Sequence, residues 1–201
     1  MIVIHAEPRS AAKDPVYNAI ILLLRHSVAD QLQTLRNLPA LSRIRRNHAL
    51  EHATIHILSQ QFPNHRFIGR SNTQGFFLYG DVPIDVLESA VQEALRRLRN
   101  GEHQLAIHPN CGTNLVMSAI LAGTASFLTL MGSEHENWRR RAERLPLAIA
   151  ATLFALIVSQ PLGLSVQQHI TTQGDPEQLE VLSIRRIHTS SNPVYHILTK
   201  N

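Results

Sequence analysis

A chain of 201 residues is long enough for one domain of ordinary size together with an appendage. Lys and Arg outnumber Asp and Glu by only 19 to 15, aromatic residues are sparse, and no zinc-finger, RRM or helix-turn-helix signature is present, so a nucleic-acid-binding function is disfavoured. The single cysteine, Cys111, excludes a framework of intrachain disulfides.

The first part of the chain is predicted to be helical. Residues 20–35 carry apolar side chains every three or four positions, which is typical of an amphipathic helix that packs on a core or lies on an anionic bilayer surface. Pro39 interrupts this pattern. A second helix is expected from there to about Gln61, where the sequence Phe62-Pro63-Asn64 ends it.

The polar segments that follow predict a small antiparallel sheet with one more helix. Residues 66–80 alternate around a turn-forming stretch and are expected to form a strand hairpin. The apolar face of residues 83–99 predicts a helix that the sequence Asn100-Gly101 ends. The remaining expected elements are a short strand over residues 103–108, a tight loop over 109–114, and a strand pair over 179–188 and 193–198.

Two uncharged apolar segments, residues 114–132 and 145–164, dominate the C-terminal half. Each has about the 20 residues that a helix needs to cross a bilayer, and small side chains in both allow two helices to approach closely. The connector between them is short and highly charged, which suits the head of a hairpin in water. The segments predict a two-helix transmembrane hairpin; the alternative is a pair of buried helices in a soluble core.

Together these elements predict an α+β soluble domain, with helices and a small antiparallel sheet, joined to a transmembrane hairpin. The expected divisions are residues 1–113 for the domain, 114–164 for the hairpin, and 165–201 for a strand pair that packs on the domain. Two spans place both termini on one side of the cell membrane. The Arg-rich connector favours a cytoplasmic hairpin head, but no signal peptide is evident before the domain, which is therefore expected in the cytoplasm.

The sequence NHALEHATIH, residues 47–56, concentrates histidine and glutamate in one expected helix. His48 and His52 are one helical turn apart and share a face, with Glu51 on the same side. We therefore expect His48 and His52 to bind zinc and Glu51 to be the general base, because a neighbouring carboxylate can take a proton from zinc-bound water. His56 is expected to be a further ligand or to support one. The alternative is an ordinary helix whose histidines make structural hydrogen bonds.

A catalytic zinc ion usually has three protein ligands and one open position for water. His108, in the loop sequence IHPNCGTN, is the preferred third ligand, and Glu88, at the border of the apolar face of its helix, is the next choice. Cys111 in the same loop offers a thiolate, which also binds zinc well. The alternative role for this thiol is that of a nucleophile activated by the nearby histidine.

Three stretches, RRNHALEHATIHIL, GRSNTQGFFLYGDV and LAIHPNCGTNLV, resemble an uncharacterised bacterial family of small integral-membrane proteins with a domain of unknown function. The resemblance runs from about Ile44 through the second apolar segment and implies a membrane location but no particular reaction. The pattern His-x-x-Glu-His, formed by His48, Glu51 and His52, also resembles the inverted zincin metallopeptidases. Those enzymes take their third ligand, a glutamate, from a distant helix. No downstream helix here offers an unmistakable equivalent, and this chain is much smaller.

The function expected from these features is that of a membrane-anchored zinc-dependent hydrolase, in the first place a peptidase. Its expected partners are the lipid bilayer and a peptide or membrane-protein substrate, whose extended segment would pair with residues 75–80; the oligomeric state is left open. The alternative is a non-enzymatic integral-membrane assembly or scaffolding protein with structural histidines. A third class, metal sensing or delivery, would need the histidines without Glu51.

Overall fold

The computed structural model describes residues 38–131, 138–188 and 193–200. The amphipathic helix expected over residues 20–35 lies outside these ranges. The chain divides into two compact units, residues 1–41 and residues 42–201, and the contacts described below lie within the second unit.

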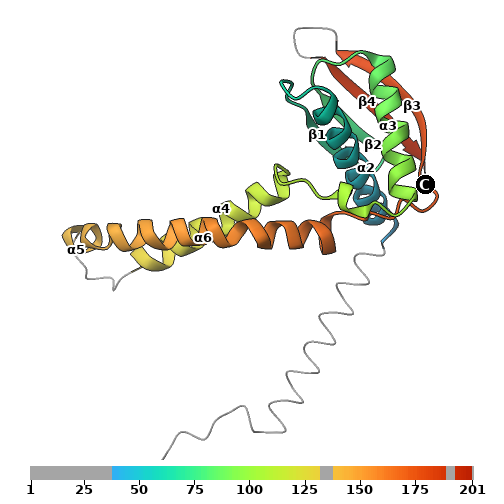
Figure 1. Cartoon of the computed structure of the whole chain (residues 1–201). Helices are drawn as coiled ribbons and strands as arrows, with labels where there is room; N and C mark the ends of the chain where they lie inside the picture. Colours follow the sequence, from blue (N-terminus) through green and yellow to red (C-terminus); the bar gives the residue numbers. More distant parts are fainter. Residues whose placement is uncertain (1–37, 132–137, 189–192, 201) are drawn as a thin grey trace, which may run out of the picture. The chain divides into compact units, whose positions relative to one another are not determined.

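The elements follow the chain in the order helix, strand hairpin, helix, helical hairpin and second strand pair (Figure 1). The short helix η2 is a 3-10 turn, and η3 is a π-helical turn that continues α6. The bounds are α2 (Pro39–Gln61), β1 (Ile68–Asn72), β2 (Gly75–Tyr79), α3 (Ile84–Arg99), η2 (His103–Ala106), α4 (Gly112–Leu130), α5 (Trp138–Glu143), α6 (Leu145–Val166), η3 (Gln167–Thr171), β3 (Glu180–His188) and β4 (Val194–Lys200).

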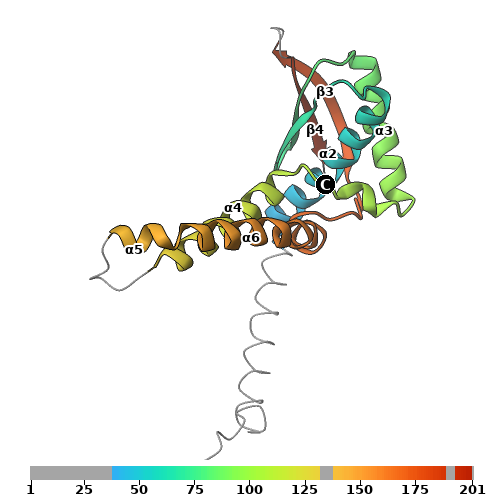
Figure 2. The same cartoon turned by 60° about the vertical axis from the view of Figure 1, so that its left-hand side comes forward.

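Within the described residues, the strands form one antiparallel sheet in the order β1-β2-β4-β3. The strands β2 and β4 are therefore central, and β1 and β3 are edges. In the register of the central pair, Phe77 lies opposite His196. The tail of the chain thus completes the sheet that the first hairpin begins, and helices α2 and α3 cover one face of it (Figures 1 and 2).

The hydrophobic core lies between this sheet and helices α2 and α3. Phe76 and Leu78 of β2 are fully buried, whereas the intervening Phe77 stacks its ring on His196 with the centroids 4.2 Å apart. Because side chains alternate along a strand, the Phe77–His196 pair lies on the face away from the helices. Leu50 of α2 is also fully buried, and a buried side chain of this kind stabilises the fold by about 1.5–3 kcal/mol. The core contacts fix α2 along one side and leave its other side for the polar motif.

The strand hairpin, the helix over residues 83–99 and the strand pair of the tail are confirmed. The strand expected over residues 103–108 is wrong, because residues 103–106 form the 3-10 turn η2. A strand uses its carbonyl groups to pair with a neighbouring strand. Here the carbonyl groups of Ala106 and Ile107 accept hydrogen bonds from the imidazoles of His52 and His56, at 2.7 and 2.8 Å.

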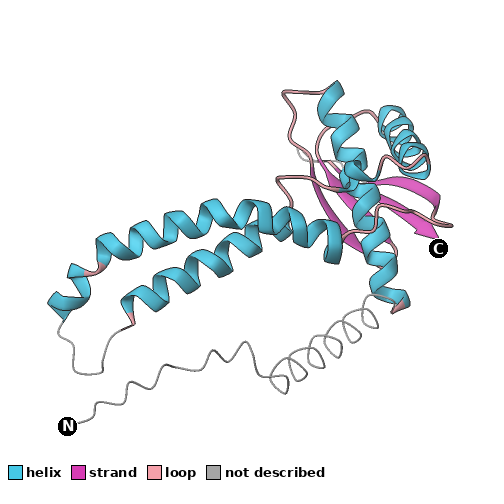
Figure 3. Ribbon diagram, turned by 60° about the horizontal axis from the view of Figure 1, so that its bottom comes forward, coloured by secondary structure: helices cyan, strands magenta, loops and turns pink. Residues whose placement is uncertain are grey.

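Helices α4 and α6 lie along each other as a helical hairpin (Figure 3). Both are long and apolar enough to cross a bilayer. At 1.5 Å per residue, their lengths are about 28 and 33 Å, close to the thickness of about 30 Å of a hydrocarbon core. Only 6% and 17% of their apolar windows are buried within the described structure. The hydroxyl groups of Ser118 and Ser159 hydrogen-bond across the helix pair at 2.7 Å.

Candidate metal centre

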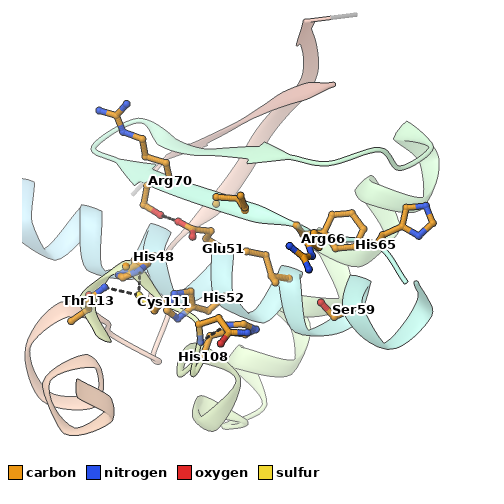
Figure 4. Close-up of a pocket in the computed structure, with 17 residues that line it drawn as sticks. His48, Glu51, His52, Ser59, His65, Arg66, Arg70, His108, Cys111 and Thr113 are labelled. Carbon is orange, nitrogen blue, oxygen red and sulfur yellow. Dashed lines mark hydrogen bonds between the residues drawn. The ribbon is translucent and has the colours of Figure 1, made fainter. Parts of the chain in front are cut away.

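A pocket of about 940 Å³ lies between helix α2, strand β1 and the loop that precedes α4 (Figure 4). Helix α2 presents its polar side to this pocket, and the edge strand β1 forms the opposite wall. The reactive side chains in its lining include His48, Glu51, His52, Ser71, His108 and Cys111. The helix that the motif predicted and the loop that carries His108 and Cys111 therefore meet at one place.

Three of these side chains are close enough to share one metal ion. The ligand atoms of His48, His52 and Cys111 all lie within 4.8 Å of one another, and the Sγ of Cys111 is 3.4 Å from the Nε2 of His48. Tetrahedral zinc with bonds of about 2.0–2.3 Å holds its ligand atoms about 3.3–3.6 Å apart. The sulfur–nitrogen distance already has this value, and small side-chain movements would complete the geometry.

Hydrogen bonds orient both imidazoles of this trio. The Nδ1–H of His48 donates to the carbonyl oxygen of Thr171 at 3.1 Å, and the Nδ1–H of His52 donates to that of Ala106 at 2.7 Å. Because a carbonyl oxygen only accepts hydrogen bonds, Nδ1 carries the proton in each ring and Nε2 keeps its lone pair. Metal-binding histidines are typically held in this way, through the second ring nitrogen.

Cys111 is placed by the beginning of helix α4, of which it is the N-cap. Its sulfur accepts a hydrogen bond from the amide of Thr113 at 3.4 Å. Burial raises the pKa of the Cys111 thiol, but the imidazole of His52 and the hydrogen bonds from Thr113 oppose burial and leave the pKa below its usual value. A lowered pKa favours the thiolate, which is the form that binds a metal.

Glu51 lies beside the trio but outside it, with its carboxyl group between α2 and β1 (Figure 4). The hydroxyl of Ser71 donates a hydrogen bond to this carboxyl group, and only 4% of the residue is exposed. Gly69 of β1 makes the room, because a Cβ at that position would overlap the carboxyl group. Burial raises the pKa of Glu51, although the charge of His48 and the hydrogen bond from Ser71 act in the opposite direction. A carboxyl group with a raised pKa is suited to accept and return a proton near neutral pH.

His108 lines the pocket, but its ring is already engaged. Its Nδ1 accepts a hydrogen bond from the amide of Asn110 at 3.2 Å, so the neutral ring carries its proton on Nε2 and has no lone pair left for a metal. Burial and the charges of His56 and His52 lower the pKa of His108 to about 4. The structure therefore brings Cys111, rather than the preferred His108, to His48 and His52.

His56 and Glu88, which the sequence also offered as metal ligands, lie apart from the trio. His56 donates its Nε2–H to the carbonyl of Ile107, and its ring packs against His108 with the centroids 4.8 Å apart. This contact makes it a support for the loop. Glu88 is exposed on α3 and lines a separate hollow next to β3. Helix α3 therefore does not supply a ligand to this pocket.

Several groups that hold the site in place were not predicted from the sequence. Gly69 and Ser71 accommodate Glu51, and the carbonyl groups of Thr171 and Ala106 orient the histidines. Backbone carbonyls leave no trace in a sequence, because every residue has one. The available signal was the polar stretch Gly69-Arg70-Ser71 in the expected strand hairpin.

This chain matches one family model and one curated protein over most of its length. The family described as Domain of unknown function (DUF6391) matches residues 43–184, a range that includes the trio and the helical hairpin. An uncharacterized protein of Picosynechococcus sp. (strain PCC 7002) is 39% identical over 155 residues, which cover 71% of this chain and 72% of that protein. No solved structure matches the chain. The protein belongs to the DUF6391 family.

Proposed function

We propose that this protein is a zinc-dependent hydrolase, in the first place a peptidase, anchored in the cell membrane by α4 and α6. The observation that carries the proposal is the trio of His48, His52 and Cys111, in which both imidazoles carry their proton on Nδ1 and turn the Nε2 lone pair to the site, and the thiol has a lowered pKa. Three protein ligands leave the fourth tetrahedral position open, as in catalytic zinc sites. Zinc would supply the Lewis acidity that makes water nucleophilic near neutral pH.

Glu51 is the general base in this proposal. Its carboxyl group lies next to the trio without belonging to it, so it is available to take a proton from the attacking water and return it to the leaving amine. Ser71 and Gly69 hold the carboxyl group in this place. The raised pKa supports this role, because a carboxyl group with its ordinary pKa is a weak base at neutral pH.

The substrate strand must differ from the one that the sequence suggested. Residues 75–80 were expected to pair with an extended substrate, but this is wrong, because β2 is paired with β1 on one side and β4 on the other. The edge strand that lines the pocket is β1. An extended peptide added along β1 would pass the trio and Glu51.

Anchoring by α4 and α6 would hold the site near the bilayer surface. Cys111 immediately precedes α4, and the outward side chains of the two helices are large and apolar: Leu115, Phe127, Phe154 and Ile157 are each more than half exposed. Apolar surface of this extent is covered by lipid in a transmembrane hairpin. We therefore propose membrane-protein segments or peptides at the cytoplasmic surface as substrates.

Protease added to sealed right-side-out cells should leave the soluble domain intact, and its digestion would refute this orientation.

A non-enzymatic assembly or scaffolding role is the second candidate. It is favoured by the fact that the same hydrogen bonds of His48 and His52 tie α2 to η3 and η2, and so contribute to the fold without a metal. Under this alternative, Glu51 has no chemical task. The Glu51→Gln variant therefore distinguishes the two candidates.

The test uses purified, zinc-loaded protein in liposomes with a library of internally quenched fluorescent peptides. Glu51→Gln is expected to retain its zinc and to lose about a hundredfold to ten-thousandfold in hydrolysis rate. The matched control is Glu88→Gln, an exposed glutamate outside the pocket, which should hydrolyse as the wild type does. Equal hydrolysis by Glu51→Gln would refute the assignment of the base. Zinc-loaded wild-type protein that cleaves none of the peptides would favour the scaffold.

A further inference from the structure

Gln167 is a polar side chain at an unusual place, the start of the π-helical turn η3 at the end of the apolar helix α6. It is fully buried, and its amide group is fully hydrogen-bonded. Its Oε1 accepts from the amide of His108 at 3.0 Å. Its Nε2 donates to the carbonyl of His108 at 3.0 Å and to the Oδ1 of Asn114 at 2.6 Å. Gln167 therefore holds the backbone of the loop that carries Cys111 by hydrogen bonds to both backbone groups of His108.

Asn114, on the other helix of the hairpin, also hydrogen-bonds to the backbone of this loop. It lies in the first turn of α4, is buried, and donates from Nδ2 to the carbonyl of Pro109 at 2.7 Å. Gly163 of α6 makes the space for it, because a Cβ there would lie 2.5 Å from the Oδ1 of Asn114. The side-chain amides of Gln167 and Asn114 meet where α4 and α6 meet. Together they hydrogen-bond to the backbone of His108 and Pro109, the two loop residues at the start of the turn.

The same π-helical turn also holds the opposite side of the site. The carbonyl of Thr171, its last residue, accepts the Nδ1–H of His48. The hydroxyl of Thr113, two residues after Cys111, donates to the hydroxyl of Thr171 at 3.4 Å. The turn thus contacts both the helix that presents His48 and the loop that presents Cys111. Single π-helical turns inside α-helices occur frequently at functional sites.

We propose that Gln167 is a positioning residue that sets the distance between the Cys111 sulfur and the two histidines, so that thiolate binding to the metal depends on the packing of α4 against α6. This inference rests on the zinc site of the proposed function and adds its regulation. The hydrogen bonds of the Gln167 side chain go to His108 in the loop and to Asn114 in the first turn of α4, so the amide joins the loop to the helix pair. A hairpin whose helices separate would release the loop and, with it, the thiolate ligand.

The experiment uses the full chain in lipid nanodiscs with Co²⁺ as the probe, because a thiolate ligand gives cobalt a charge-transfer absorption band in the near ultraviolet. The variant is Gln167→Ala, and the matched control is Gln168→Ala, the same substitution one residue later at an exposed position. We expect Gln167→Ala to lose most of the thiolate band and roughly tenfold or more in cobalt affinity, with helical circular dichroism unchanged. Gln168→Ala should equal the wild type.

A wild-type band and wild-type affinity in Gln167→Ala would overturn the inference. If Gln167→Ala loses its helical signal, Asn114→Ala provides the second measurement, because it removes the Pro109 hydrogen bond and leaves those of Gln167 to His108. It should weaken the thiolate band in the same direction, and an unchanged band would again overturn the inference. Absence of the band in the wild-type protein would instead refute the trio of the proposed function, and the positioning role with it.

Discussion

Replacing Gly69 with alanine would disturb Glu51 without touching a metal ligand. The new methyl group would overlap the carboxyl group of Glu51, which is almost completely buried and receives a hydrogen bond from Ser71. Overpacking of this kind costs about 1–3 kcal/mol. In a protein of this size, 1 kcal/mol lowers the melting temperature by about 2–4 °C, so we expect a decrease of about 2–12 °C. If Glu51 moves aside instead, the loss will fall on hydrolysis.

Thermal unfolding, zinc content and peptide hydrolysis of the Gly69→Ala variant test this reasoning together. Zinc should be retained, because Glu51 is not one of the three ligands, while hydrolysis should fall at least tenfold. The matched control is Gly112→Ala, which lies on the wall of the same pocket but whose Cβ would meet nothing within 4 Å. A Gly69→Ala protein with wild-type stability and wild-type hydrolysis would show that Glu51 does not occupy this position.

Three further predictions concern pH and packing. His108 has a pKa of about 4 in the fold against an ordinary 6.5, so its contribution to stability is complete above about pH 6.5 and is lost as the pH falls towards 4. The full shift corresponds to about 3 kcal/mol, which water screening at this half-buried ring reduces to about 1–2 kcal/mol. An NMR titration that gives a pKa near 6.5 for His108 would contradict this prediction. Glu51 has a raised pKa, so the cost of burying its charge sets in as the pH rises above the ordinary 4.5 and is complete above the raised pKa. Glu51→Gln should therefore raise the melting temperature of the metal-free protein at pH 8 but not at pH 4, and equal effects at both pH values would contradict this sign. Gly163→Ala places a Cβ against Asn114 and should lower the free energy of unfolding by about 1–3 kcal/mol. In the control Gly123→Ala, the new Cβ meets nothing within 4 Å, and the free energy of unfolding should rise by up to about 1 kcal/mol. Denaturation in detergent measures both changes.

The elements that follow from local patterns could be predicted from the sequence. Apolar periodicity placed the helix over residues 83–99, and the uncharged lengths placed α4 and α6, because these properties belong to each segment alone. The strand over residues 103–108 could not be judged in this way. The carbonyl groups of Ala106 and Ile107 in this segment accept hydrogen bonds from His52 and His56, which lie on a helix about 50 residues earlier in the chain.

The third member of the trio also depended on contacts that the sequence does not display. His108 was the preferred ligand and Cys111 an alternative, and both lie in the same loop sequence, IHPNCGTN. The amide of Asn110 occupies the Nδ1 of His108, and the N-cap position of Cys111 brings its sulfur to His48, 63 residues earlier in the chain. In the sequence, Gln167 only follows an apolar segment, and its role emerges from its hydrogen bonds to His108.

The central claim is that His48, His52 and Cys111 hold one zinc ion, and zinc content tests it most directly. The measurement is mass spectrometry of detergent-purified protein, prepared without chelator and reconstituted with zinc. About one zinc per chain is expected in the wild type and in His108→Ala, and the metal should be lost from His52→Ala and Cys111→Ala. Zinc retained by Cys111→Ala but lost by His108→Ala would contradict the trio, and a wild-type protein that binds no zinc would contradict the metal site itself.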